Sequence, residues 1–422
     1  MKRISVVTLL VLLTAYATAA WAQDGPPLCR AARTVATHMQ ERGVRITLGN
    51  RVEFFSAGHQ KFERLFADVA LARRQVDLEY FNFRNDSIAG LLFSLLARKA
   101  GEGVQVRAVY DAFGNASNNR PISRAMHDSI AALGIQLRKF DPIRFPWVNH
   151  IIPRDHRKIV VIDGHVAYTG GMNVADYYIE GLPGIGPWHD LHMRIEGPAV
   201  ADLQAVFCGM WRKVEGKGFS VQDSPAGPDS LYGPAGPDSL STPLAIIDRD
   251  PSRQPDAIRD LYVTMLDAAR HSVKLINPYF VPTHRVRAAL KRAVDRGLDV
   301  QILLSAKSDI PMTPEVTHYV GNNLMKRGAR VFLYEGGFHH TKMMVIDDSL
   351  ATVGSANLDA RSLRCDYEVN TLILSPQVTQ QLVRLFQAQL PSSTEIHPGF
   401  WRTRTRWKRF VGWFGNLLTP VL

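Results

Sequence analysis

Residues 340–347 read His-Thr-Lys-Met-Met-Val-Ile-Asp, and residues 156–163 read His-Arg-Lys-Ile-Val-Val-Ile-Asp. Both stretches have the form His-x-Lys-x4-Asp, with four mainly aliphatic residues before the aspartate. Each is followed by a glycine-containing turn, residues 354–357 (Gly-Ser-Ala-Asn) and 170–173 (Gly-Gly-Met-Asn), so that an asparagine stands seventeen positions after each histidine. One His-x-Lys alone is most often a chance pair in a core strand, but two copies of the whole pattern indicate two half-sites.

The spacing of the motif predicts that its histidine and its lysine share one face of a strand. The aliphatic run is typical of a buried strand, and residues i and i+2 of a strand point the same way. An imidazole attacks or transfers a proton near neutral pH, and an ammonium group beside it neutralises a phosphate oxygen. We therefore expect four catalytic residues, His156, Lys158, His340 and Lys342.

The aspartates of the two motifs have a different place. Asp163 and Asp347 lie seven residues after each histidine, an odd number, so they face the other way or follow the end of the strand. We include them in the catalytic set as supporting residues.

The glycine-containing turns are expected to bind the substrate. Asn173 and Asn357 would bring amide donors back to the same phosphate as the histidines and lysines. The substrate-binding residues that we expect are Asn173, Asn357, Gly171 and Ser355.

The repeat extends beyond the motifs. The first half is expected to contain a helix at 62–72, a strand at 76–83, a helix at 87–100 and a strand at 104–110, and the second a helix at 259–269, a strand at 273–280, a helix at 285–296 and a strand at 300–304. Alternating helices and strands indicate an α/β fold of two halves with mixed sheets. Because each half carries one motif, we expect a pseudo-two-fold axis and an active site at the interface of the halves.

The paired motif resembles the phospholipase D superfamily. The second copy continues through residues 354–363 (Gly-Ser-Ala-Asn-Leu-Asp-Ala-Arg-Ser-Leu) to 367–369 (Tyr-Glu-Val), and the first copy is followed by 188–192 (Trp-His-Asp-Leu-His) and 194–198 (Arg-Ile-Glu-Gly-Pro). These extensions are similar to the bacterial cardiolipin synthase branch, and the resemblance covers about residues 45–422.

The resemblance implies a phosphatidyltransferase that makes cardiolipin and glycerol from two molecules of phosphatidylglycerol. It implies attack by His156 to give a phosphohistidine, with His340 as acid and base, although the symmetry of the halves makes these roles exchangeable. We expect no cofactor and no metal. Two alternatives stay open: an exported phospholipase D that hydrolyses phospholipids to phosphatidic acid, and a nuclease or other phosphodiesterase of the same superfamily.

Two acids stand at matching places after the motifs. Asp190 follows the first histidine by 34 positions and Glu368 follows the second by 28, and the difference of six matches an insertion at residues 181–186. We therefore pair Asp190 with Glu368 as supporting residues that each hold an imidazole ring. The alternative is that both are ordinary solvated acids in surface loops.

The chain divides into five segments. Residues 1–22 have a charged start, an apolar run and an Ala-Trp-Ala site, as in a secretory signal peptide. Residues 45–215 and 244–395 form the two phospholipase D-like halves. Residues 216–243, rich in Gly, Pro, Asp and Ser, form a linker. Residues 400–422 form a basic amphipathic C-terminal segment.

The signal sequence and the cysteines bear on location. We expect an exported, periplasmic enzyme that associates peripherally with a membrane, and the alternative is an inner-membrane protein held by an uncleaved N-terminal anchor. The three cysteines, Cys29, Cys208 and Cys365, allow at most one intrachain disulfide and have no metal-ligand spacing.

Charge and the C-terminal segment bear on partners. The formal net charge of +11 favours an anionic partner. Near the C-terminus, basic residues precede an apolar helical face built from Trp407, Phe410, Val411, Phe414, Leu417, Leu418 and Val421. This pattern suits an anionic phospholipid membrane containing phosphatidylglycerol, and the alternative is a last helix packed on the protein itself. We do not expect nucleic acid as partner, and we expect a monomer to be active because both half-sites lie in one chain.

Overall fold

The computed structural model describes residues 28–142, 152–216 and 241–417. The predicted signal peptide, nearly all of the predicted linker and the last five residues of the C-terminal segment lie outside these ranges. The second half begins with a strand at Thr242–Arg249, inside the last residues assigned to the linker.

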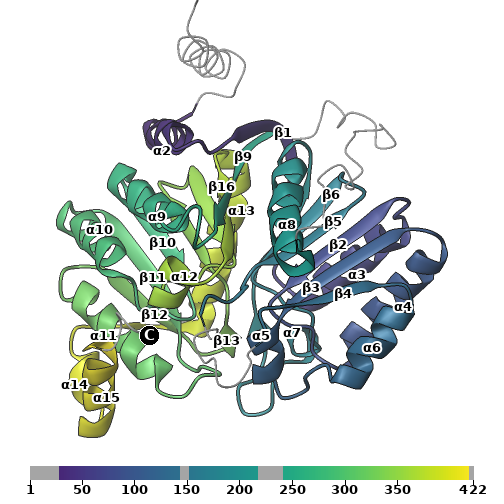
Figure 1. The fold of residues 1–422 in the computed structure, drawn as a ribbon. Coiled ribbons are helices and arrows are strands. Elements are labelled where there is room, and N and C mark those ends of the chain that lie inside the picture. Colours follow the sequence, from purple (N-terminus) through teal and green to yellow (C-terminus); the bar gives the residue numbers. More distant parts are fainter. Residues whose placement is uncertain (1–27, 143–151, 217–240, 418–422) are drawn as a thin grey trace, which may run out of the picture.

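One mixed sheet of fifteen strands runs through the described part of the chain (Figure 1). The strands of the first half are β1 (Ile46–Phe55), β2 (Gln75–Tyr80), β3 (Gln105–Asp111), β4 (Gln136–Phe140), β5 (Lys158–Ile162), β6 (Val166–Gly170) and β8 (His192–Glu196). Those of the second half are β9 (Thr242–Arg249), β10 (Ser272–Ile276), β11 (Asp299–Ser305), β12 (Arg330–Tyr334), β14 (Met343–Ile346), β15 (Leu350–Gly354), β16 (Glu368–Ile373) and β17 (Ser393–Ile396).

The order of the strands repeats on either side of a central seam. Outward from the seam, the first half reads β1-β8-β6-β5-β2-β3-β4 and the second reads β9-β16-β15-β14-β10-β11-β12, with β17 added at its edge. The seam itself is the antiparallel pair β1–β9. Strands β2, β3 and β4 pair in parallel, as do β10, β11 and β12, while the other neighbours are antiparallel. The two α/β halves with mixed sheets are confirmed.

Helices cover both faces of the sheet. The helices that link parallel or neighbouring strands are α3 (Gly58–Ala70), α4 (Ser87–Gly101), α5 (Ala112–Ser117), α6 (Arg124–Ala132), α9 (Ala257–Ala268), α10 (His284–Asp295) and α11 (Thr313–Met325), and the first described helix is α2 (Arg30–Glu41). Their apolar faces form one buried core in each half.

Two further helices occupy the space between the halves. These are α8 (Ala199–Glu215) and α13 (Pro376–Gln389), which lie at the centre of the molecule (Figure 1). Leu203 of α8 and Phe386 of α13 are fully buried in one cluster with Ile159 of β5 and Val345 of β14. Since this cluster draws on both motif strands, burial of apolar surface ties the halves together.

The remaining described elements are short segments around the loops and at the C-terminus. They are α7 (Tyr177–Glu180), β7 (Trp188–His189), β13 (Phe338–His339), α12 (Ala360–Arg364), the 3-10 helix η3 (Leu390–Ser392), α14 (Phe400–Thr403) and α15 (Arg406–Leu417). Nowhere in the described ranges does a helix combine the length and the apolar character needed to cross a bilayer.

The motif aspartates follow the ends of β5 and β14, opposite to the ends where the histidines stand. The Asp163 carboxylate accepts backbone N–H groups of Arg73, Arg74 and Gln75 at 2.8–2.9 Å. The Asp347 carboxylate accepts those of residues 270–272 at 2.7–3.2 Å. This placement agrees with the interpretation of both aspartates as supporting residues, and their place in the catalytic set stays a prediction. They fix the loop that enters β2 or β10, and they lie a strand's length from the imidazoles.

We expect Asp347→Ala to destabilise the protein by about 2 kcal/mol, because three backbone donors lose a charged acceptor. Turnover per folded molecule should be unchanged. The neighbouring Asp348→Ala is the matched control. Both residues have a positive φ, but Asp348 only pairs with Lys274 near the surface, so its loss should cost less than about 1 kcal/mol. Thermal unfolding and turnover are measured on the same preparations. An Asp347→Ala protein of normal stability without turnover would show that the aspartate is needed for catalysis.

Candidate active site

The two histidines stand at one edge of the sheet. His156 precedes β5 and His340 precedes β14, and both strands run antiparallel to the parallel strands beside them. The histidines therefore lie at the carboxyl ends of β2 and β10. In open α/β sheets this edge is where ligands bind.

A crossed pair of backbone hydrogen bonds joins the halves at this edge. The N–H of His156 donates to the carbonyl of Tyr367 at 3.0 Å, and the N–H of His340 donates to the carbonyl of His189 at 2.6 Å. In each case the acceptor immediately precedes the supporting acid, Glu368 or Asp190. The second crossing is reinforced by a two-stranded parallel sheet, β7 with β13, in which Phe338 pairs with Trp188.

Each imidazole is consequently held by the carboxylate of the other half. Nδ1 of His156 lies 2.9 Å from Oε1 of Glu368, and Nδ1 of His340 lies 2.6 Å from Oδ2 of Asp190. Both acids are almost completely buried, which excludes the alternative of solvated surface acids. A carboxylate on Nδ1 holds the ring in the orientation and tautomer that leave Nε2 for the reaction.

The two carboxylates are themselves held by hydrogen-bond donors. Glu368 accepts the hydroxyls of Ser355 and Ser362, the latter at 2.5 Å. Asp190 accepts the N–H of Leu191 at 2.8 Å. Opposite charges nearby then outweigh burial and lower the pKa of both acids. Both are ionised at neutral pH.

Gly171 and Ser355 hold equivalent places in the repeat, and both contact a carboxylate. A Cβ on Gly171 would come within 2.1 Å of Oδ1 of Asp190, so only glycine leaves room for that acid. The Ser355 hydroxyl donates to Glu368. Both residues therefore position the acids behind the imidazoles, and their expected role in substrate binding stays a prediction.

The motif lysines are fully buried beside the histidines. Nζ of Lys158 lies 2.5 Å from the carbonyl of His156, and Nζ of Lys342 lies 3.1 Å from Nε2 of His340. Burial lowers the pKa of Lys158 to about 7 and that of Lys342 to about 8, against the opposing effect of the two acids. A bound phosphate anion would favour the charged form of both lysines.

Burial also lowers the pKa of both histidines. The pKa of His340 falls to about 4, and that of His156 falls as well, although the neighbouring carboxylates oppose the change. Both rings are therefore neutral at pH 7. A neutral imidazole whose Nδ1–H donates a hydrogen bond to a carboxylate acts as a nucleophile or a base through Nε2.

The asparagines lie at the same edge, after β6 and β15. Asn173 and Asn357 are 5% and 6% exposed, and within the described residues the Oδ1 atom of each has no hydrogen-bond partner. The buried side chain of Lys61 donates to the carbonyl of Asn173 at 3.4 Å and supports that turn. The placement agrees with the expected role of these amides, which stays a prediction.

An aromatic wall surrounds the imidazoles, and the motif analysis did not predict it. The ring of His340 lies 5.4 Å from Trp188, 5.5 Å from Phe338 and 5.9 Å from Tyr279, and that of His156 lies 5.1 Å from Phe81. The only sequence signal was position, since Trp188 stands two residues before Asp190. Such a wall lowers the local dielectric and strengthens each electrostatic interaction inside the site.

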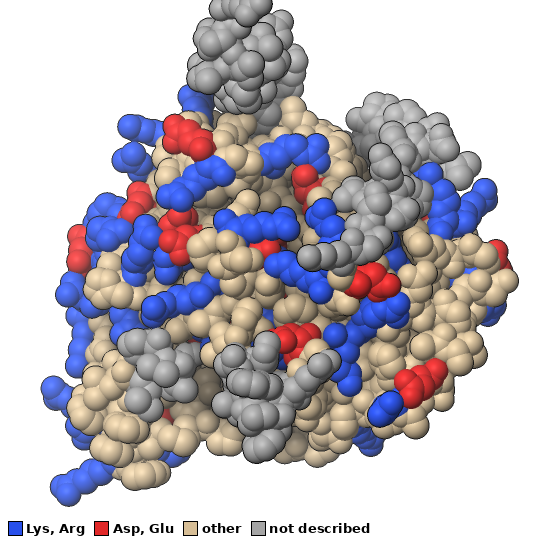
Figure 2. All heavy atoms as spheres, viewed as in Figure 1, with Lys and Arg blue, Asp and Glu red and all other residues tan. Residues whose placement is uncertain are grey.

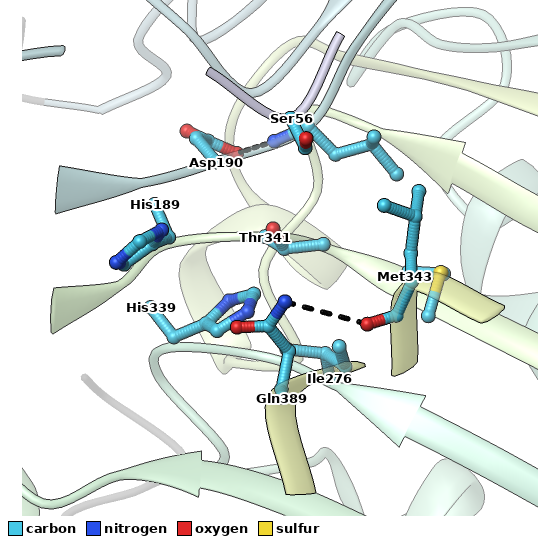
Figure 3. A pocket seen from close by; sticks show the side chains of 10 residues that line it. Ser56, His189, Asp190, Ile276, His339, Thr341, Met343 and Gln389 are labelled. Atoms are coloured by element: carbon cyan, nitrogen blue, oxygen red, sulfur yellow. Dashed lines mark hydrogen bonds between the residues drawn. The ribbon is translucent and has the colours of Figure 1, made fainter. Parts of the chain in front are cut away.

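A cavity of about 70 Å³ lies beside Asp190, between β7, β13 and the end of α13 (Figure 3). Its polar lining includes His189, His339 and Gln389, and the Gln389 amide donates to the carbonyl of Leu385. Neither His156 nor His340 is among the described residues that line it. It has room for a few water molecules and none for a lipid.

The sequence is similar to proteins described as cardiolipin synthases. A family model described as "Cardiolipin synthase, PLD-like domain" matches residues 65–207 and 262–390. The chain is 32% identical over 381 residues to a cardiolipin synthase of Listeria monocytogenes, covering 90% of this chain and 77% of that protein. It is 31% identical over 397 residues to that of Oceanobacillus iheyensis, covering 94% and 80%.

Among solved structures, the fold is similar to that of the phosphatidylserine synthase of Haemophilus influenzae. The TM-score is 0.69 at 14% identity, over 92% of this chain and all of that one. A polyphosphate kinase of Porphyromonas gingivalis aligns with a TM-score of 0.53 at 12% identity, over 82% of this chain and 49% of that one. At these identities the likeness concerns the fold alone.

The crossed pairs predict a specific effect of pH on turnover of a phosphodiester. The fall of kcat/KM in acid should report protonation of His156, below the ordinary histidine pKa of about 6.5. Glu368 raises the pKa of His156, so Glu368→Gln should move this fall to lower pH. It should also reduce the rate about 10²- to 10⁴-fold, because the ring loses its orientation.

Asp190→Asn is the matched comparison for that profile. Its carboxylate faces His340, so the rate should fall while the acid limb stays in place. A limb that moves to higher pH in Glu368→Gln, or that moves only in Asp190→Asn, would contradict the assignment of the limb to His156.

Proposed function

The chain belongs to the phospholipase D superfamily, in its cardiolipin synthase-like branch, and from this membership and the crossed half-sites we propose how it acts. It is a phosphatidyltransferase of that family. We propose that His156 is the nucleophile, that His340 is the acid and base, and that both substrates are phosphatidylglycerol.

The proposed reaction has two steps on one site. Nε2 of His156 attacks the phosphorus of the first phosphatidylglycerol, the bond to the glycerol oxygen breaks, and His340 gives that oxygen a proton. Glycerol leaves and phosphatidyl-His156 remains. His340 then takes the proton from a hydroxyl of the second phosphatidylglycerol, whose oxygen attacks the phosphorus and releases His156. The product is cardiolipin.

The observation that carries this proposal is the pair of imidazoles that share one site and each donate Nδ1–H to an acid of the other half. The side chain of His156 is 15% exposed and that of His340 is 7% exposed. The more accessible ring is better placed to attack a large substrate. The buried lysines stabilise negative charge on the non-bridging oxygens in the transition state.

The lowered histidine pKa values fit the order of events. The lowered pKa of His156 keeps it neutral, as a nucleophile must be, and that of His340 keeps it neutral too. An arriving phosphodiester brings a negative charge into a buried site, which favours protonation of His340. The general acid is thereby formed when the anionic substrate is bound.

The acceptor decides between transfer and hydrolysis. The aromatic wall of Trp188, Phe338 and Tyr279 presents apolar surface to the reacting centre, which favours a lipid alcohol over water. We propose that a monomer is active because both half-sites lie in one chain. Export to the periplasm stays a prediction from residues 1–22.

The first test is the product formed from phosphatidylglycerol vesicles, resolved by mass spectrometry. We expect cardiolipin and an equal amount of glycerol, both reduced at least about 10³-fold in His156→Ala. Phosphatidic acid without cardiolipin would make the chain a hydrolase, and the absence of any lipid product would favour a phosphodiesterase acting on another substrate.

A second test identifies the nucleophile. In His340→Ala the first step lacks its acid and the second lacks its base, so phosphatidyl-enzyme should accumulate when the leaving alcohol is a good one, such as p-nitrophenol. Peptide mass spectrometry should find the adduct on His156, and His156→Ala should form none. An adduct on His340 in the His156→Ala protein would reverse the two roles.

A further inference from the structure

We propose that α15 docks on an anionic lipid surface together with an apolar rim, formed by Ile152, Ile179, Ile310 and Met312. Docking would turn the active site toward the lipid. This inference rests on the proposed function and adds how the enzyme meets its substrate. The helices α15, α11 and α7 and the strand β13 lie along the lower side of the molecule in Figure 1.

The exposed apolar side chains gather on this side. In the described part of the chain, five of the large exposed hydrophobic residues stand on α15, with 43–69% of each exposed: Trp407, Phe410, Trp413, Phe414 and Leu417. Four more are Ile179 on α7, Ile310 and Met312 just before α11, and Ile152, four residues before His156. The remaining three, Leu71, Leu91 and Leu133, are on or beside the helices of the first half.

The buried residues by which α15 is attached to the protein are Val411, Gly412 and Gly415. A Cβ on Gly412 would come within 2.5 Å of Trp401, and one on Gly415 would come equally close to Val316 of α11. Glu315 of α11 pairs with Arg404 and Lys408. The helix α15 therefore packs on the body, as one alternative from the sequence expects, while four described residues of its predicted apolar face remain exposed: Trp407, Phe410, Phe414 and Leu417.

The aromatic residues form a ridge along the exposed side of α15. The ring of Phe410 stacks 5.8 Å from Trp407 and 5.7 Å from Phe414, and it lies 6.1 Å from Trp413. Trp and Phe on a helix held parallel to a surface are suited to the boundary between headgroups and acyl chains. Figure 2 shows this region, at the lower left, as a largely tan surface edged by Lys and Arg.

The charge of α15 selects an anionic surface. No acidic residue follows Glu395 in the chain, and residues 402–409 contain five cations. Arg406 and Arg409 are exposed and border an open groove with Phe410 and Trp413. Basic side chains beside inserted aromatics bind anionic headgroups. A second copy of this helix would bring like charges together, so the charge disfavours self-association.

The rim connects this surface to the reacting histidines. Ile310 and Met312 stand in the loop that leads into α11, and Asp309 of that loop accepts the hydroxyl of Tyr279 at 2.7 Å. The ring of Tyr279 in turn contacts His340. A bilayer that touches α15 and this loop would therefore meet the mouth of the site.

The other half contributes to the same rim. Ile179 follows Tyr177 and Tyr178, whose rings pack on Trp188 beside His340. Lys307 donates to the carbonyl of Ile185 at 3.4 Å and so joins the loops of the two halves. A donor lipid in the bilayer would reach the site without leaving the interface completely.

The test uses flotation of the predicted mature chain (residues 23–422), which contains every described residue, with His156→Ala so that no lipid is consumed. Vesicles contain phosphatidylglycerol and phosphatidylcholine, or phosphatidylcholine alone. Trp407→Ser/Phe410→Ser/Trp413→Ser should weaken binding to the anionic vesicles at least about tenfold. The control variant Leu71→Ser/Leu91→Ser/Leu133→Ser changes three similarly exposed residues elsewhere. It should bind the vesicles as tightly as the His156→Ala protein without further substitutions.

Charge and turnover complete the test. Arg406→Gln/Arg409→Gln should weaken binding to anionic vesicles about fivefold for each cation removed. With His156 intact, the aromatic variant should lose turnover on vesicles and keep it on short-chain phosphatidylglycerol dispersed as monomers. Loss on both substrates would overturn the docking role.

Three further outcomes would decide the matter. Equal vesicle binding by the aromatic variant and the leucine variant would overturn the proposal, as would sedimentation showing a dimer that the aromatic substitutions dissociate. Vesicle binding that depends on the aromatic ridge, in a protein without lipid turnover, would support docking and refute the proposed function alone.

Discussion

The structure depends on two hydrogen bonds in which the catalytic histidine of each half pairs with the acid of the other half. His156 and His340 each donate a backbone N–H to the residue that precedes the other half's acid, and each ring then meets that acid. A buried carboxylate without a partner is costly, and breaking a buried pair is strongly destabilising. The arrangement therefore holds only when both halves are docked, so the site and the interface form together.

The surroundings of the two histidine–acid pairs are similar but not identical. Half-site one has Glu368 with two serine hydroxyls, and half-site two has the shorter Asp190 beside Gly171, where no side chain fits. The environments lower the pKa of His340 to about 4 and that of His156 as well. Two chemically equal motifs thus acquire different surroundings, which is a basis for dividing the roles of nucleophile and acid between them.

On the outer surface, glycines decide how closely α15 packs on the body. Glycines on one face of α15 allow close packing on α11, and this leaves the aromatic ridge exposed. Helical periodicity located an apolar face at Trp407, Phe410 and Phe414 and favoured a membrane. Gly412 and Gly415 were not part of that face. Periodicity measures which residues are apolar, and it does not measure where a backbone can approach another closely.

The sequence by itself determined the repeat, the α/β halves and the histidines, lysines and acids of the site, because alternating elements and matching motifs are local patterns. It did not show the partners of Asp163, Asp347, Gly171 and Ser355, which are backbone amides and carboxylates that a motif does not reveal. Only the tertiary structure decided that Glu368 serves His156 and Asp190 serves His340. Those pairs join residues 212 and 150 positions apart, and contacts at such separation arise from the docking of the two halves, which no local pattern records.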